Sequence, residues 1–179
     1  MDLGAEEKES VVLDKPQHKI ADYFGVARPS LARALGDREG AVQALQIAEQ
    51  TLQSSPLWHM ILHLASCQVQ HWLWLGNLQT AARWAECDPA VTGRAPPGHL
   101  PVYLQEVQRI SLARVQLAQG KTREVQQTLS GLAEQATAAG RMTQAMESSL
   151  LQALILQAQD HTDAALVHLD QCLSWAKPE

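Results

Sequence analysis

Apolar residues recur every three or four positions along most of the chain, and short breaks interrupt this pattern at regular distances. The stretch LARVQLAQG ends at Gly120 and is followed directly by a second segment with the same helical period. Similar breaks occur at Gly76, 44 residues earlier, and at Asp160, 40 residues later. A period of this length indicates stacked helical hairpins, none of which can bury its apolar face alone.

We therefore predict an all-α fold, a right-handed superhelix of stacked antiparallel helical hairpins of the tetratricopeptide-like kind. Each hairpin consists of a first helix, a tight turn and a second helix. A small or apolar residue stands five positions after each break, as Ala81, Val125 and Ala165, and marks a shared position of the repeat. The second helix after Gly120 is predicted as a single segment, KTREVQQTLSGLAEQA.

Three parts of the chain follow from this pattern. Residues 1–15 carry no periodicity and are expected to be a disordered start. Residues 16–55 are expected to form one helical hairpin, either helix-turn-helix-like or a degenerate repeat. Residues 56–179 are expected to form the tetratricopeptide-like repeats.

Composition narrows the class of protein. Apolar residues make up 46% of the 179 residues, but there are only one Phe and two Tyr, a balance that favours helix over strand. A net charge of −5 without any basic block argues against a chain-wide nucleic-acid-binding surface. No apolar run is long enough to span a bilayer, and no signal peptide is visible. Three widely spaced cysteines favour reduced thiols, so we expect a cytoplasmic protein with no membrane partner.

The segment 17–35, QHKIADYFGVARPSLARAL, contains the parts of a helix-turn-helix. A first helix would end near Phe24, Gly25 would supply the turn, and Pro29 suits the first turn of a second helix. The wording resembles the recognition hairpin of Crp/Fnr-type winged-helix regulators. This resemblance implies contacts with the major groove of DNA through Arg28, Ser30 and Arg33.

The same segment fits one more repeat with a shortened first helix. Gly36 lies 40 residues before Gly76, and Ala41 stands five positions after it. A winged helix needs strands after this point, whereas AVQALQIAEQTL is helical in period and composition. The pattern favours the repeat, and DNA contact by residues 17–35 stays open as the alternative.

The most apolar predicted helix, residues 57–75, carries one broad apolar face and an opposite polar strip. Beside the strip, potential metal ligands recur at four-residue steps, as His59, His63, Cys67 and His71. Each step rotates by about 40 degrees relative to a full turn, so the four side chains diverge along the helix. No acidic or CxxC set accompanies them, so we expect a polar groove lining and neither a metal nor another cofactor.

Aromatic, amide and imidazole groups near this strip suit a polar organic ligand such as a sugar, which stacks on a ring and hydrogen-bonds through its hydroxyls. The candidate ligand-binding groove consists of His59, His63, Gln70, Trp74 and Tyr103.

Three blocks near the end of the chain occur in a characteristic order. They are YLQEVQRISLARVQLAQG, AAGRMTQAMESSLLQALILQAQ and DAALVHLDQCLSWAKPE. Together, from His99 to Glu179, they resemble the C-terminal part of the helical-repeat sensor region of MalT-like, LuxR-family transcription activators; AARWAE, from Ala81 to Glu86, fits more loosely. The resemblance implies a tetratricopeptide-type superhelix that receives a small-molecule inducer or a regulatory protein.

In that family an ATPase module precedes the repeats and a DNA-binding helix-turn-helix follows them. The present sequence contains no GxxxxGK[ST] loop, so ATP binding is unsupported. Its last residues, KPE, fall where the family would continue towards its DNA reader. We therefore expect a sensor segment, with DNA reading left to an absent C-terminal region or to residues 17–35.

Four charged residues in the matching blocks fall on predicted first helices of neighbouring hairpins. Bidentate arginine–carboxylate pairs between such helices could fix the register of one hairpin against the next; ligand contact is the alternative. The residues are Glu106, Arg114, Arg141 and Glu147.

Catalytic motifs are missing. The sequence has no Gly-x-Ser-x-Gly elbow, no HExxH pair and no Cys/His nucleophile arrangement, so we expect a binding protein and not an enzyme. The leading hypothesis is a ligand- or protein-binding sensor module of a bacterial LuxR/MalT-like transcriptional regulator. The alternatives are a small DNA-binding regulator that uses residues 17–35, and a generic protein–protein interaction scaffold.

Overall fold

The computed structural model describes residues 28–54, 58–86 and 101–176. Within these ranges 86% of the residues are helical and there is no strand. The all-α class predicted from the sequence is therefore confirmed. The expected disordered start and the first helix of the helix-turn-helix, before residue 28, lie outside the described residues.

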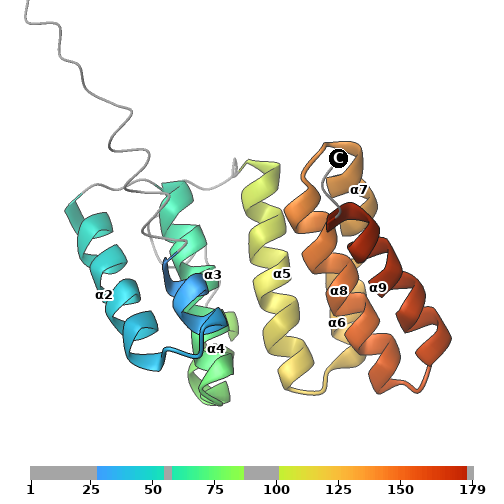
Figure 1. The fold of residues 1–179 in the computed structure, drawn as a ribbon, viewed down its shortest axis with the longest axis horizontal. Helices are drawn as coiled ribbons and strands as arrows, with labels where there is room; N and C mark the ends of the chain where they lie inside the picture. Colours follow the sequence, from blue (N-terminus) through green and yellow to red (C-terminus); the bar gives the residue numbers. More distant parts are fainter. Residues whose placement is uncertain (1–27, 55–57, 87–100, 177–179) are drawn as a thin grey trace, which may run out of the picture.

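The helices follow one another as antiparallel pairs (Figure 1). A helical segment at residues 28–34 precedes α2 (Arg38–Ser54), and α3 (Trp58–Trp74) precedes α4 (Leu78–Glu86). The next pair is α5 (Val102–Ala118) with α6 (Thr122–Leu129) and α7 (Leu132–Ala138). The last pair is α8 (Met142–Ala158) with α9 (Thr162–Ala176). None of the described helices combines the length and apolar character that crossing a membrane requires.

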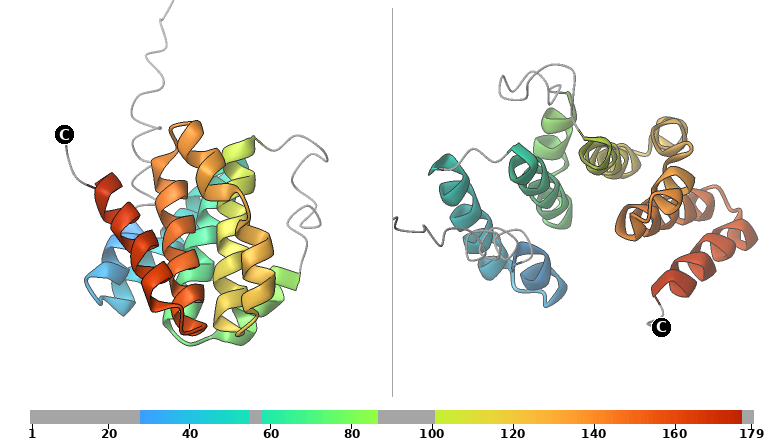
Figure 2. Two further views of the ribbon diagram at one scale, coloured as in Figure 1. Left: turned by 90° about the vertical axis from the view of Figure 1, so that its right-hand side faces the viewer. Right: turned by 90° about the horizontal axis from the view of Figure 1, so that it is seen from above.

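The hairpins stack through their first helices. Helix α3 packs on α5 and α5 packs on α8, while the second helices α4, α6 and α7 each pack on the first helix of the hairpin that follows. Seen from above, the hairpins follow one another along a curved row (Figure 2). This is the helical-repeat superhelix that the sequence predicts.

The predicted breaks are the corners of the hairpins. Gly120 adopts a φ of 73° and Asp160 a φ of 60°, in the left-handed region that glycine enters without strain. At each corner the next amide donates back across the helix end, from Lys121 N to Gln116 O and from His161 N to Leu156 O, both at 2.9 Å. These bonds satisfy carbonyls at the end of the first helix.

The small residues five positions after the corners are buried, as expected for a repeat position. Ala81, Val125 and Ala165 lie at the start of their second helices, each with its amide bonded to the residue four positions earlier. Ala41 and Ala145 occupy the same position after Gly36 and Gly140 and are also buried.

The predicted single helix after Gly120 is wrong, because the chain breaks it into α6 and α7. Gly131 adopts a φ of 68°, which ends the helical hydrogen-bond pattern. The freed carbonyls are bound by Arg109 of α5, whose Nε donates to Thr128 O at 2.8 Å and whose Nη2 donates to Ser130 O at 3.0 Å. A side chain 22 residues upstream thus stabilises a break that helical period alone does not predict.

Within the described residues, three separate apolar clusters form the core. The first joins α2 to α3 through Leu45, Ala48, Leu64 and Cys67. A second joins α3, α4 and α5 around Val69, Ala81 and Val115. The largest joins α5 to α8 and includes Ile110, Leu129, Leu132 and Ile155.

The ladder of potential metal ligands on α3 is partly covered. Cys67 and His71 are buried, whereas His63 is half-buried, because α3 has neighbours on several sides: α2, α4 and α5. A helix packed in this way buries more than the single apolar face that a surface helix shows.

Candidate functional site

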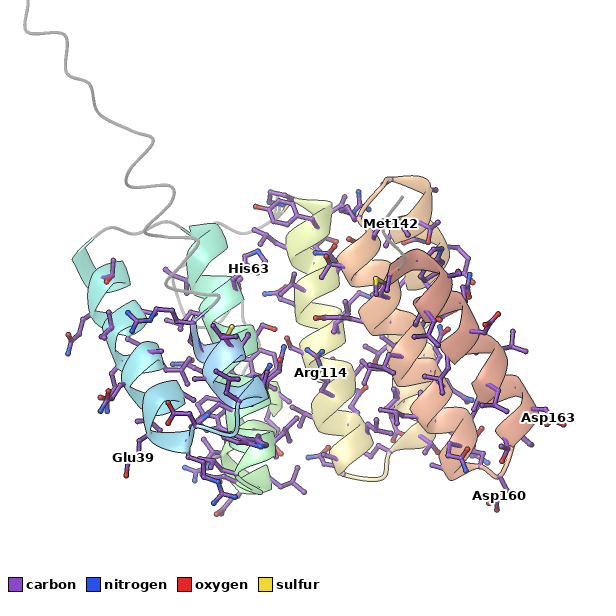
Figure 3. All side chains as sticks on the ribbon, viewed as in Figure 1. Glu39, His63, Arg114, Met142, Asp160 and Asp163 are labelled. Atoms are coloured by element: carbon purple, nitrogen blue, oxygen red, sulfur yellow. The ribbon has the colours of Figure 1, made fainter. Side chains whose placement is uncertain are left out.

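The first helices α3, α5 and α8, the residue just before α8, and residues 28–34 carry a row of polar and charged side chains, here named the first-helix row. Its members are Arg33, His63, Gln70, Tyr103, Glu106, Arg114, Arg141 and Glu147. His63 lies on α3 and Arg114 lies on α5, the first helix of the next hairpin (Figure 3). The row therefore crosses every hairpin of the stack.

The strongest contact in the row joins Glu106 to Arg141. Nε and Nη2 of Arg141 donate to the two carboxylate oxygens of Glu106, both at 2.7 Å. The Glu106 side chain is 3% exposed and the Arg141 side chain 28%. The hydrogen bonds and charge of Glu106 raise the pKa of Arg141 above its ordinary value. The sequence pattern places Arg141 on a first helix, but in the structure Arg141 is the residue just before α8. Its guanidinium therefore links the corner at Gly140 to α5.

A second pair is weaker. Arg114 Nη2 lies 3.4 Å from Glu147 Oε2, a single contact between side chains that are 20% and 36% exposed. Arg114 Nη1 is buried without a hydrogen-bond partner. The two pairs thus connect α8 to α5 at different strengths, and the bidentate geometry of Glu106 makes it the better register contact.

At the start of the stack, Arg33 donates to Oε1 of Gln70 on α3. Burial lowers the pKa of Arg33, and the nearby positive charge of Arg114 lowers it further. Ser30 is half-buried and hydrogen-bonds the thiol of Cys67, whereas Arg28 is exposed. Two of the three residues proposed to contact DNA are therefore engaged with α3.

The residues after Gly36 form α2, where a winged helix would require strands. The hairpin of residues 28–34 and α2 instead repeats the geometry of the later hairpins, with Ala41 buried five positions after the corner. This arrangement favours the degenerate repeat over the recognition hairpin.

Four of the five candidate ligand-binding residues have described side chains, and these make contacts at separate places. His63 stacks on Tyr103, with ring centroids 6.3 Å apart and an interplanar angle of 26°. Gln70 is bonded to Arg33. Trp74 lies under the guanidinium of Arg38, 5.6 Å from its ring centroid. His63 and Trp74 are eleven residues apart on α3, roughly 16 Å along the axis, so the four candidates with described side chains are spread along α3 and the start of α5.

The side chain of His59 lies outside the described residues. Among the residues that the structure describes, no three His, Cys, Asp or Glu side chains gather closely enough to hold a metal ion.

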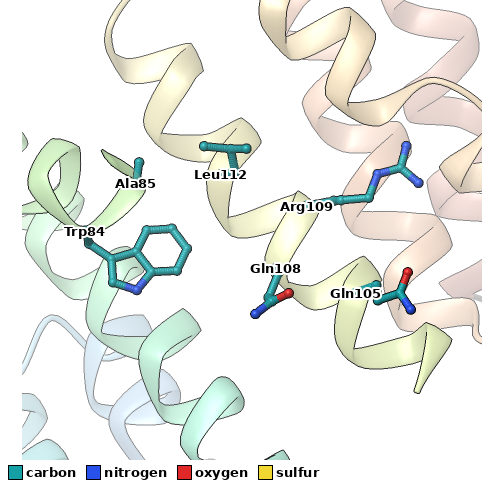
Figure 4. A pocket seen from close by; sticks show the side chains of 6 residues that line it. All are labelled: Trp84, Ala85, Gln105, Gln108, Arg109 and Leu112. Carbon is teal, nitrogen blue, oxygen red and sulfur yellow. The ribbon is translucent and has the colours of Figure 1, made fainter. Parts of the chain in front are cut away.

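A cleft of about 320 Å³ opens between α4 and α5. Trp84 directs its indole ring towards α5, where Gln108 and Leu112 face it (Figure 4). Gln105, Ala85 and the aliphatic part of Arg109 complete the lining. The cleft offers a ring face, an apolar wall and two amides, but no pair of acid–base groups.

Helical period cannot reveal this cleft, because its walls come from different hairpins. The sequence feature that points to it is Trp84, a large aromatic residue near the end of the short amphipathic segment NLQTAARWAE.

The model of one protein family, described as the MalT-like TPR region, matches residues 12–179. The chain belongs to the MalT-like TPR family. The match begins at residue 12, far upstream of His99, where the resemblance seen in the sequence begins, and it includes residues 17–35. No curated protein and no solved structure matches the chain.

Proposed function

We propose that the chain is the signal-receiving module of a MalT-type transcriptional regulator, which binds an inducer and performs no catalysis itself. The observation that carries this proposal is the family match across residues 12–179. A regulator of this kind would act in the cytoplasm. The curved stack supports the role, because a change at one hairpin alters its packing on the next.

The cleft between α4 and α5 is the best candidate for a small-molecule inducer. Its volume of about 320 Å³ falls at the lower end of the range for ligand pockets. A flat, polar organic molecule could stack on Trp84 and hydrogen-bond to Gln105 and Gln108. Because α4 and α5 belong to successive hairpins, a ligand held between them would bias the angle at which the hairpins pack.

The test is a thermal-shift screen of the full chain against a panel of small polar metabolites, with hits measured by calorimetric titration. The variant Gln108→Leu should weaken binding of a hit at least about tenfold, because it removes a hydrogen-bonding partner in the cleft. The matched control Gln127→Leu changes an exposed glutamine of α6 and should leave affinity unchanged. A hit that both variants bind equally would contradict the cleft as its site.

A regulatory protein is the other signal consistent with the family. It would contact the first-helix row, so charge reversal at Glu147, which is partly exposed, should weaken its binding while Gln108→Leu does not. This difference separates the two kinds of signal.

The DNA-binding alternative makes a different prediction. A gel shift by the chain that is lost in Arg28→Ala and Arg33→Ala variants would favour a small DNA-binding regulator. We expect no such shift, because Arg33 is engaged with Gln70. A generic scaffold would bind helical partners without any effect on transcription of a reporter.

A further inference from the structure

Arg109 is the one charged residue among the described residues that line the cleft between α4 and α5. The rest of this lining is neutral and consists of Trp84, Ala85, Gln105, Gln108 and Leu112. The lining residues of α5 are three or four positions apart along the helix, so they share one of its faces. Trp84 lies at one side of the cleft and the guanidinium of Arg109 at the other (Figure 4). The cleft therefore has an aromatic side and a cationic side.

Two backbone carbonyls hold the guanidinium of Arg109 in place. Nε donates to Thr128 O at 2.8 Å, and Nη2 donates to Ser130 O at 3.0 Å. Both bonds use the edge of the planar group that Nε and Nη2 share. The end of the group, formed by Nη1 and the second hydrogen of Nη2, is left for another acceptor.

A ligand in the cleft can reach this end of the guanidinium. Within the described part of the chain, no residue accepts a hydrogen bond from Nη1 of Arg109. Nη1 is also not one of the buried polar atoms that lack a partner there, which belong to His71, Arg114 and Ser148. It is therefore open to solvent.

The positive charge of Arg109 is not balanced by a carboxylate. Its two partners are carbonyl oxygens, which carry only partial charges. Arg109 takes no part in the ion pairs of the described residues, which are Arg114–Glu147 and Arg141–Glu106. The C-terminal end of the α6 dipole, near which the guanidinium lies, supplies only about half of a negative charge. The cleft can therefore accept an anionic group at this side.

We propose that the ligand of this cleft is a planar organic carboxylate, whose ring stacks on Trp84 and whose two oxygens accept from the open end of Arg109. This assignment rests on the inducer site proposed above and names the chemical class of the inducer. One guanidinium balances one negative charge, and its parallel N–H groups match the two oxygens of a carboxylate. A phosphate dianion would need a second cation. Because Thr128 O and Ser130 O already fix the guanidinium, less conformational freedom is lost on binding.

The first test varies the ligand and leaves the protein unaltered. Benzoate, cinnamate and nicotinate, each paired with its primary amide, are titrated into the full chain and followed by calorimetry. At least one acid should bind at least about tenfold more tightly than its amide, because only the acid offers a charged acceptor. The difference should shrink at high salt, which screens the charge. Acids that bind no better than their amides, or that do not bind at millimolar concentration, would overturn the proposal.

The second test varies Arg109. The variant Arg109→Gln removes the charge but keeps an amide that can donate to the carbonyls at the end of α6. It should weaken binding of the acid at least about tenfold and leave the affinity for the amide unchanged. The matched control Arg123→Gln makes the same change of charge at an exposed residue of α6 and should leave both affinities unchanged. An acid that binds Arg109→Gln as tightly as the original chain would overturn the proposal.

The variant Gln108→Leu separates a failure of this assignment from a failure of the inducer site. Neutral ring compounds that bind as tightly as the acids, and whose binding Gln108→Leu weakens, would keep the site and overturn the carboxylate. A chain that binds neither acids nor amides in a way that depends on Gln108 would overturn the site as well.

Discussion

Substitution of the Glu106–Arg141 pair measures how strongly one hairpin is held against the next. Glu106→Ala removes a carboxylate that is 3% exposed and accepts two hydrogen bonds of 2.7 Å. Breaking a fully buried ion pair costs about 3–5 kcal/mol. Here the guanidinium that remains is partly exposed, so water can replace the lost partner, and we expect a loss of about 2 kcal/mol in the free energy of unfolding.

Arg141→Ala should be the more damaging change. It leaves the Glu106 carboxylate buried between α5 and α8 without a counter-charge, where water cannot reach it readily. The double variant should be more stable than the sum of the two losses predicts, because removing both partners leaves no isolated buried charge.

Urea unfolding followed by circular dichroism, analysed as a double-mutant cycle, provides the measurement. Glu147→Ala is the control, since Glu147 makes a single 3.4 Å contact and is 36% exposed; such partly exposed pairs contribute about 0–1 kcal/mol. The reasoning fails if Glu106→Ala costs no more than this control, or if Arg141→Ala costs less than Glu106→Ala.

Three further predictions test other parts of the structure. Asp160→Gly should stabilise the chain and Gly120→Ala should destabilise it, each by roughly 1 kcal/mol, because both corners have a positive φ that glycine adopts more easily than other residues. Melting temperatures of the two variants that shift in the same direction would contradict this. Burial lowers the pKa of His71, so the unfolded chain binds a proton before the folded chain as the pH falls below about 6.5, and stability is lost towards pH 5. The His71→Phe variant should lose less stability on the same change of pH. If melts at pH 7 and pH 5 show the same loss in the variant as in the original chain, His71 is not the cause. Burial raises the pKa of the Cys67 thiol, so iodoacetamide at pH 8 should label the half-buried Cys172 at least about tenfold faster than it labels Cys67. Equal labelling rates of the two cysteines, measured by mass spectrometry of the native protein, would show that Cys67 is accessible.

Much of the fold could be predicted from local pattern, because each hairpin is built from contacts close in sequence. A corner needs a positive φ, and Gly76 and Gly120 stand where the helical period stops. The break at Gly131 was missed for a physical reason. It depends on Arg109, which binds the carbonyls freed at the end of α6, and such a contact is not visible in the period of either segment.

The candidate site was harder to predict, since it depends on how helices are rotated against one another. Charged residues on first helices could be recognised as partners because α5 and α8 had to be adjacent in the stack. The groove on α3 could not be placed, because Arg33 binds Gln70 and the guanidinium of Arg38 lies over Trp74, and both arginines come from the preceding hairpin. Trp84 and Gln108 become neighbours only when two hairpins stack, so no helical wheel brings them together.

The division of the interior into three clusters has a consequence for how the molecule yields to stress. Among the residues that the structure describes, the cluster between α2 and α3 contains four buried residues and the cluster around Val69 contains three, whereas the cluster between α5 and α8 contains nine. Stability in such a linear array is approximately a sum of local terms and neighbour contacts. Among the described hairpins, the pair formed by α5 and α8 should therefore be the last to loosen, and it can hold its shape while the helices before α5 detach and return.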